Sequence, residues 1–300
     1  MPLNDYIIHV FCLIDDIYHN LFGSKGVRKA GYSAILQDSE LITMVTIGEF
    51  LGLSDNKKIW LYFKSCYQYY FPNISLVSYK IFNKHATNLW LVMRYIQVEI
   101  LKQFHDCDLY LADGLPLPIC HLSRYKRCTL FHDKTALGYC AAKDERYYGF
   151  KIILVTTEDG VPTDYAIDAA NIDERELLTR TTIPEHTTII ADKDFINSKL
   201  QYELKQSYDI NLLTPTRKNM LHKISDEFAK LITTVRKRIE TTISQLTETF
   251  SINKTKARSF HGLLGRINRK ILSYTMALFF NFQMVKDQER LSQLEHLIQA

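Results

Sequence analysis

The chain has 300 residues, 46% hydrophobic and 23% charged, which is the balance of an ordinary globular protein, and its length admits two domains. A net charge of only +4 does not by itself indicate a nucleic-acid-binding protein. No basic segment precedes an apolar run at the N-terminus, and no uncharged stretch is long enough to span a bilayer, so the sequence excludes an ordinary signal peptide and predicts a cytoplasmic protein without a membrane partner.

Residues 1–105 are predicted to form an all-helical N-terminal domain. Apolar residues recur every three to four positions, and serine or aspartate stands at the expected helix starts. The expected helices cover 7–21, 39–50 and 55–71, and a fourth that begins at Ser75 or Ser78 and ends at about Phe104. Because basic and acidic residues nearly balance here, the pattern leaves two roles open, DNA binding and dimerisation or packing.

The periodicity changes to that of strands after residue 107. The expected strands are 109–113, 147–156, 161–169, 187–191 and 210–214, and the expected helices are 173–180, 196–206, 221–250 and 262–290. Asp159-Gly160 is a turn signal that joins the second and third strands as a hairpin. We therefore predict, over 106–300, an α/β domain whose mixed five-stranded sheet has flanking helices. This order of elements is the ribonuclease-H-like one.

Two predicted strands end in an acidic residue. Leu109 to Ala112 lead into Asp113, and we expect Gly114 and the two prolines that follow to end the strand there. Such an aspartate can simply cap a turn, but a second β-branched run ends in the same way at Asp192. In the predicted topology these two strands are parallel neighbours, so both acids should lie at adjacent carboxyl ends, where ligands gather in open α/β sheets.

A third acid is expected from the helix around 236–250. Glu240 lies at the boundary of its apolar stripe, one turn after Arg236. Alone, Glu240 is a surface ion-pair residue, but with Asp113 and Asp192 it predicts a cluster of three carboxylates within reach of one ion. Oxygen ligands without His or Cys favour Mg²⁺, with Mn²⁺ as a substitute. Two such ions can support in-line phosphoryl transfer.

Basic residues concentrate near the C-terminal end. Residues 217–270 hold thirteen Lys or Arg and four acidic residues, a surplus of nine positive charges. This stretch is a candidate phosphate-facing surface, and the alternative is a solvated helix face. A second basic stretch covers 121–135.

Several short motifs resemble those of one enzyme family. They are Ala112 to Pro118 with Cys120 and Arg124, Tyr148-Gly149-Phe150-Lys151, Ala191-Asp192-Lys193 and Arg236 to Thr241. Together they resemble the DDE transposases of bacterial insertion sequences, closest to the insertion-sequence 982 family. The resemblance implies that Asp113, Asp192 and Glu240 are the catalytic, metal-binding triad. It also implies that Lys193 and Arg236 lie beside the scissile phosphate.

The resemblance implies double-stranded DNA as partner, namely the element's terminal inverted repeats and the target, with a homodimer acting on it. The residues expected to contact DNA are Arg124, Lys126, Arg127, Lys151, Lys193, Arg236, Lys237, Lys254, Lys256 and Arg258. Thr233 and Thr247 stand where a related motif has Tyr and Lys, and Asp194 stands where it has Gly. Asp192 follows the apolar strand directly and is the expected ligand, whereas Asp194 is expected to cap the next helix. The alternatives are a nuclease of the same fold that does not join strands, and a non-catalytic DNA-binding protein.

Overall fold

The computed structural model describes residues 1–24, 26–27, 34–53, 55–131, 133–140, 144–216 and 225–284. The chain divides into two compact units, a helical unit made of Met1–Phe104 with Leu246–Ala300 and a sheet unit made of His105–Gln245. One boundary between the units lies between Phe104 and His105. The residues from Leu246 onward group with the N-terminal helices. The predicted domain of residues 106–300 would instead place them with the sheet.

The helical unit consists of helices with short connections. They are α1 (Leu3–Phe22), α2 (Asp38–Phe50), α3 (Asn56–Cys66), α4 (Tyr79–Asn88), α5 (Trp90–Leu101) and α9 (Phe260–Met284), with a short 3₁₀ turn η1 (Pro72–Leu76). Asp55 and Ser78 cap α3 and α4 through their side chains. A capping box formed by Gln37 and Glu40 starts α2. The single helix predicted over 78–104 is interrupted at Leu89, and 285–290 of the last predicted helix lie outside the described residues.

A buried ionic cluster explains why the C-terminal residues belong to the helical unit. The carboxylate of Glu49 in α2 pairs with both Arg269 and Lys270 in α9, and all three side chains are almost fully buried. Lys270 also donates a hydrogen bond to the carbonyl of Phe250 at 2.6 Å. Buried charges are tolerated only when they are paired, so these contacts fix α9 against α2 although the two are far apart in the sequence.

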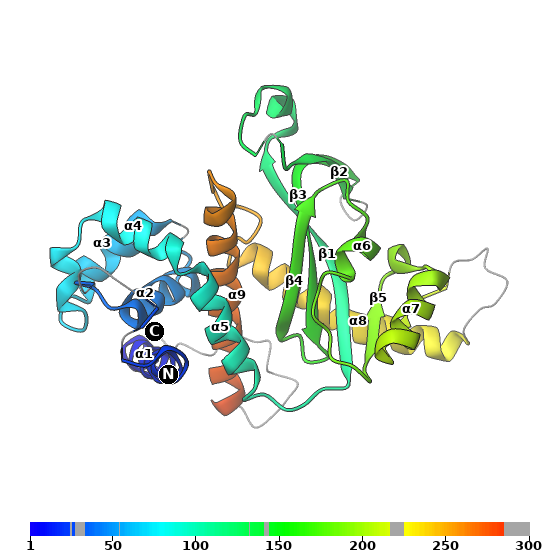
Figure 1. The fold of residues 1–300 in the computed structure, drawn as a ribbon, viewed down its shortest axis with the longest axis horizontal. Helices are drawn as coiled ribbons and strands as arrows, with labels where there is room; N and C mark the ends of the chain where they lie inside the picture. The colour runs from blue at the N-terminus through cyan, green and yellow to red at the C-terminus, as the bar shows by residue number, and fades with distance from the viewer. Residues whose placement is uncertain are drawn as a thin grey trace. The chain divides into compact units, whose positions relative to one another are not determined.

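The described residues of the sheet unit form one six-stranded sheet. Figure 1 labels its strands β1 to β5. The six strands are β1 (Leu109–Cys120), β2 (Ala136–Cys140), β3 (Glu145–Thr157), β4 (Pro162–Ala169), β5 (Thr188–Ala191) and β6 (Asn211–Leu213). Their order is β2-β3-β1-β5-β6, and β4 also pairs with β3. The strands β1, β5 and β6 are parallel, while β3 is antiparallel to its neighbours. The mixed sheet is confirmed, and β2, which pairs with the first half of β3, is one strand more than predicted.

Helices cover both faces of this sheet, as expected. Alternate residues of β1 and β5, such as Tyr110 and Ile189, pack into a core with residues of α6 (Glu174–Leu178) and α7 (Ser198–Tyr208). The intervening residues Leu111 and Ile190 pack on the other face against α8 (Asp226–Glu248). Since successive side chains of a strand point to opposite faces, the two cores follow directly from the β-branched runs. Residues 217–224, which include the predicted start of α8, lie outside the described residues.

The first strand is longer than predicted, because β1 continues through Gly114, Pro116 and Pro118. Its ladder with β5 ends at Ala112, but its ladder with β3 runs on to Cys120. Among the described residues, no strand pairs with the other edge of β1 beyond Ala112, and prolines two residues apart can both direct their nitrogen to that edge. The prediction that these residues end the strand was wrong for this reason. Among the described residues, no helix is long and apolar enough to cross a membrane.

Candidate active site

The two strand-end aspartates lie next to each other in the register. Ala112 and Ala191 form the last pair of the parallel ladder between β1 and β5, so Asp113 and Asp192 are the next residue on each strand. By alternation both acids share the face of Leu111 and Ile190, which is the face covered by α8. The pairing thus places the two carboxylates side by side, as predicted, although Asp113 lies within β1 and not at its end.

Helix α8 supplies Arg236 and Glu240 to the same place. The guanidinium of Arg236 lies 3.5 Å from a carboxylate oxygen of Asp113, 3.3 Å from one of Asp192 and 3.7 Å from one of Glu240. Its side chain is only 12% exposed, whereas those of Asp192 and Glu240 are 39% and 55% exposed. One guanidinium therefore stands among the three acids, and the four residues are called the acid–Arg236 cluster below.

Asp113 is the acid whose proton affinity the fold changes most. Burial raises the pKa of Asp113 to about 6, and the charges of Asp192 and Glu174 contribute in the same direction. A hydrogen bond of 2.7 Å from the backbone N–H of Gly114 and the charge of Arg236 act to lower that pKa. The carboxylate of Asp113 is thus a desolvated anion with a single cation among its charged neighbours at close range, which is an environment that favours binding of a further cation.

The donor set fits a hard divalent ion, since the three acids offer only carboxylate oxygens. Within the described ranges, no three side chains of Asp, Glu, His or Cys gather closely enough to hold one ion. The expected convergence of Asp113, Asp192 and Glu240 is seen here as three ion pairs to Arg236.

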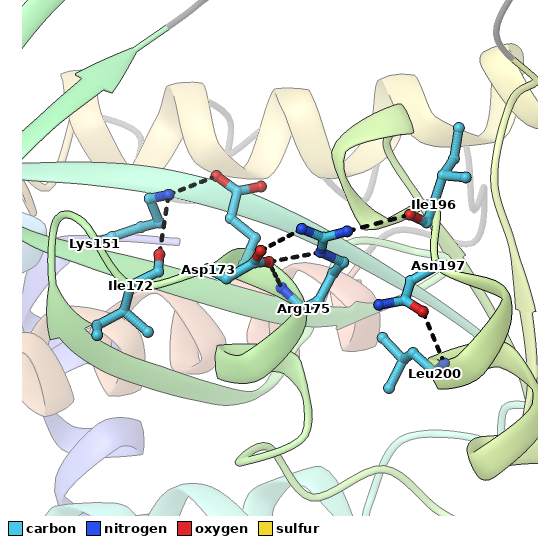
Figure 2. Close-up of polar contacts among 8 residues, drawn as sticks. Lys151, Ile172, Asp173, Arg175, Ile196, Asn197 and Leu200 are labelled. Atoms are coloured by element: carbon cyan, nitrogen blue, oxygen red, sulfur yellow. Dashed lines mark hydrogen bonds and ion pairs between the residues drawn. The ribbon is translucent and has the colours of Figure 1, made fainter.

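A cavity of about 550 Å³ opens beside Asp113 and Asp192, where β1 extends past the end of β5. Its other wall is the start of α6, shown in Figure 2. Asp173 caps α6 by accepting from the backbone and the side chain of Arg175, and Arg175 reaches the carbonyl of Ile196 at 3.5 Å. This link ties α6 to the segment that follows β5, so both sides of the cavity are connected.

Glu174 is a further acid that lines this cavity, and the sequence analysis missed it. Its carboxylate lies 3.1 Å from the ammonium of Lys151. A Cβ built at Gly114 would lie 3.0 Å from Oε1 of Glu174, so a larger residue at 114 would require the Glu174 carboxylate to shift slightly. The sequence signal was weak, because an acid in the first turn of a helix is common on any surface. Only the fold brings Glu174 next to Asp113.

The predicted DNA-contacting residues have different surroundings. Most are exposed, but Lys151 and Arg236 are largely buried, with side chains 15% and 12% exposed. Lys151 pairs with Glu174 and donates a hydrogen bond to the carbonyl of Ile172 (Figure 2). Those exposed in the sheet unit are Arg124, Lys126 and Arg127 in the 3₁₀ turn η2 (Leu122–Arg127), together with Lys193 and Lys237. Those exposed in the helical unit are Lys254, Lys256 and Arg258.

Asp194 does not have its predicted role. The cap of α7 is Asn197, whose side chain accepts from the backbone N–H groups of Lys199 and Leu200. Asp194 lies in the 3₁₀ turn η4 (Lys193–Phe195), which Asp192 caps, and it lines the cavity. The turn that follows Asp192 separates Asp194 from the helix it was expected to cap.

Comparison with known proteins places this geometry in context. The family model described as "Transposase DDE domain" matches residues 105–260, more than half of the chain. Among solved structures, the chain is similar to the cryo-EM structure of a piggyBac transposase synaptic complex with hairpin DNA, with 12% sequence identity and a TM-score of 0.47. That match covers 95% of this chain and 76% of the other. No curated protein matches the chain.

Proposed function

Because the chain belongs to the DDE transposase family, we propose that it cuts DNA at the ends of an insertion sequence and joins the freed 3′-hydroxyl to target DNA. Family membership supports phosphoryl transfer on DNA. The acid–Arg236 cluster, which lies where the parallel ladder of β1 and β5 ends, is the observation that supports this site for the reaction. The motifs around Asp113 further support an insertion-sequence element of the 982 family.

Asp113, Asp192 and Glu240 would hold Mg²⁺ or Mn²⁺ in this proposal, with two ions in the complete site. Bound ions would supply activation of the attacking oxygen and stabilisation of the leaving oxygen. The protein positions the acids by different means. The ladder on either side of β1 and the Gly114 N–H hold Asp113, and α8 holds Glu240 one turn after Arg236.

Basic side chains near the acids would bind the phosphate that reacts. Arg236 carries a planar group suited to phosphate oxygens, and Lys193 is exposed directly after Asp192. The exposed residues Arg124, Lys126, Arg127 and Lys237 would bind flanking phosphates of the duplex. Since Lys151 is paired with Glu174, we assign it to the support of the cavity wall.

The test uses an oligonucleotide duplex that carries the element end. Asp113→Asn should lower cleavage by at least about 100-fold, because it removes an anionic ligand from the reacting centre, and should leave binding of the end intact. The matched control is Asp106→Asn, which removes an exposed carboxylate a short distance before β1 and should cut normally. Normal cleavage by Asp113→Asn would refute the assignment of this site.

Strand joining is measured separately with a pre-cut end that has a free 3′-hydroxyl. A transposase should join this end to target DNA, and inverted repeats should bracket the gene. If the protein cuts but never joins under conditions that assemble the complex, it is a nuclease of the same fold. If it binds the end without cutting or joining, it is a DNA-binding protein.

A further inference from the structure

The contacts of the Arg236 guanidinium do not use all of its hydrogen-bond donors. Its distances of 3.3 to 3.7 Å to the three acids are longer than the 2.7 to 2.9 Å of charge-assisted hydrogen bonds. Its Nε is buried and has no hydrogen-bond partner among the described residues. The guanidinium is therefore held among the acids by its charge and not by a set of directed hydrogen bonds.

The positive charge of Arg236 offsets the repulsion among the three acids. Three carboxylates around one guanidinium repel one another, and burial makes Asp113 poorly hydrated as well. A cation at the centre offsets both effects and keeps the acids facing one another. Each acid reaches the same guanidinium, so a cation that binds these carboxylates competes with Arg236 for them.

We infer that Arg236 is the internal counter-ion of the acid–Arg236 cluster and that it competes with divalent cations for the three carboxylates. Loading of the site then requires the guanidinium to withdraw, which frees it to bind a DNA phosphate. This inference rests on the proposed function, because it assumes that the acids bind divalent ions. It adds that Arg236 has two successive roles: it holds the three acids in order before divalent ions bind, and it binds a DNA phosphate afterwards.

The first test measures Mn²⁺ binding to the full chain without DNA, by counting free Mn²⁺ with electron paramagnetic resonance. Arg236→Gln should bind Mn²⁺ at least about fivefold more tightly than the wild type, a ratio at the low end of coupling between competing ligands. The matched control is Lys237→Gln, which removes the same charge from the next, exposed residue and should stay within about twofold of the wild type.

The outcomes separate the inference from the proposed function. Equal or weaker binding by Arg236→Gln, while the wild type binds Mn²⁺, would overturn the competition and leave the metal site intact. If neither the wild type nor either variant binds Mn²⁺ at millimolar concentration, the metal site itself fails and the inference with it.

A second measurement needs no variant and so does not depend on the folding of Arg236→Gln. In the wild type, the nuclear magnetic resonance signal of the Arg236 Nε–H reports its buried position. The amide of Lys193, which donates to Asp192 at 2.5 Å, reports on the carboxylate itself. Saturating Mg²⁺ should shift both signals together. A shift of the Lys193 amide with an unchanged Arg236 Nε–H would overturn the inference.

Discussion

The position of Asp113 is determined by where the parallel ladder between β1 and β5 stops. The parallel ladder of β1 and β5 ends one residue before it, so its side chain leaves a rigid backbone at the point where a neighbouring strand stops. The same is true of Asp192 on the facing strand. A rigid backbone matters because a displacement of about 1 Å at a reacting centre can cost about 100-fold in rate.

This reasoning distinguishes Asp192 from Asp194. Asp192→Asn should eliminate both end cleavage and joining of pre-cut ends, since one site would serve both steps. Asp194→Asn should leave both steps largely intact and change the free energy of unfolding by no more than about 0.5 kcal/mol, because Asp194 is exposed and α7 is capped by Asn197 instead. The cleavage and joining assays, with a denaturant titration of each variant, check this. If Asp194→Asn is the inactive variant, the second acid has been assigned wrongly.

The cap of α6 should depend on pH. The hydrogen bonds and charge of Arg175 lower the pKa of Asp173 below its usual value of 3.8. A lowered folded-state pKa means that the cap stabilises α6 fully above the unfolded pKa and is lost as the pH falls through the folded one. Its loss should cost about 1 kcal/mol, seen as faster hydrogen exchange of the Leu177 amide, which bonds to the Asp173 carbonyl.

Asp173→Asn provides the control for this pH dependence. Asparagine keeps a cap oxygen but carries no ionisable group, so the exchange of the Leu177 amide should lose its dependence on pH below about 4, apart from the intrinsic chemical rate. A wild-type profile identical to that of Asp173→Asn would show that the Asp173–Arg175 pair does not stabilise α6.

At the scale of elements, the close pairing of β1 with β3 is the feature that extends the sheet beyond Asp113. Gly149 pairs with Pro118 on one side and with Ala136 of β2 on the other. A Cβ at this position would lie 2.2 Å from the carbonyl oxygen of Leu117, which is backbone and cannot move alone. The glycine in the Tyr148-Gly149-Phe150-Lys151 motif therefore has a structural reason.

Gly149→Ala should consequently destabilise the protein by about 2–3 kcal/mol, the upper part of the range for overpacking. The measurement is the free energy of unfolding from a denaturant titration followed by circular dichroism. Gly262→Ala is the matched control, because its Cβ would meet only the hydroxyl of Ser259 at 3.0 Å and should change stability by less than about 1 kcal/mol. Equal effects of both substitutions would contradict the proposed close approach of β1 and β3.

At the scale of the whole molecule, either unit offers exposed basic residues for the proposed binding of DNA. Replacing Lys254, Lys256 and Arg258 by Gln should lower the salt slope of binding by about 0.9 for each phosphate that the variant no longer neutralises. The three side chains are exposed in the helical unit. The slope is measured as the logarithm of the association constant against the logarithm of salt concentration, for specific and random duplexes alike.

A second triple variant in the same unit is the control. Lys57, Lys58 and Lys80 are also exposed, lie in α3 and α4, and remove the same charge when replaced by Gln. If only this second variant lowers the slope, DNA binds the N-terminal helices, which is the DNA-binding role left open for residues 1–105. If only the first does, the basic stretch of 217–270 meets phosphates.

The sequence alone determined the order of the elements, apart from β2, and the two acids that follow the apolar runs of β1 and β5. β-Branched runs, turn residues and helix caps act over a few positions, so Asp55 and Ser78 could be recognised as caps, and Asp113 and Asp192 as neighbours on parallel strands. The position of Glu240 at the edge of its apolar stripe made it the expected third acid, and the family resemblance implied the same residue. These features are local, or follow from a topology with few alternatives.

Only the tertiary structure decided how the side chains fill the space between elements. It placed Arg236 among the acids, brought Glu174 beside Gly114, and let β1 run past its prolines because no described strand pairs with one of its edges there. It also buried Glu49 with Lys270, which joins the C-terminal helix to the N-terminal ones. The physical reason is that burial and ion pairing depend on residues far apart in the chain, and no local pattern records which distant charge will come within about 4 Å.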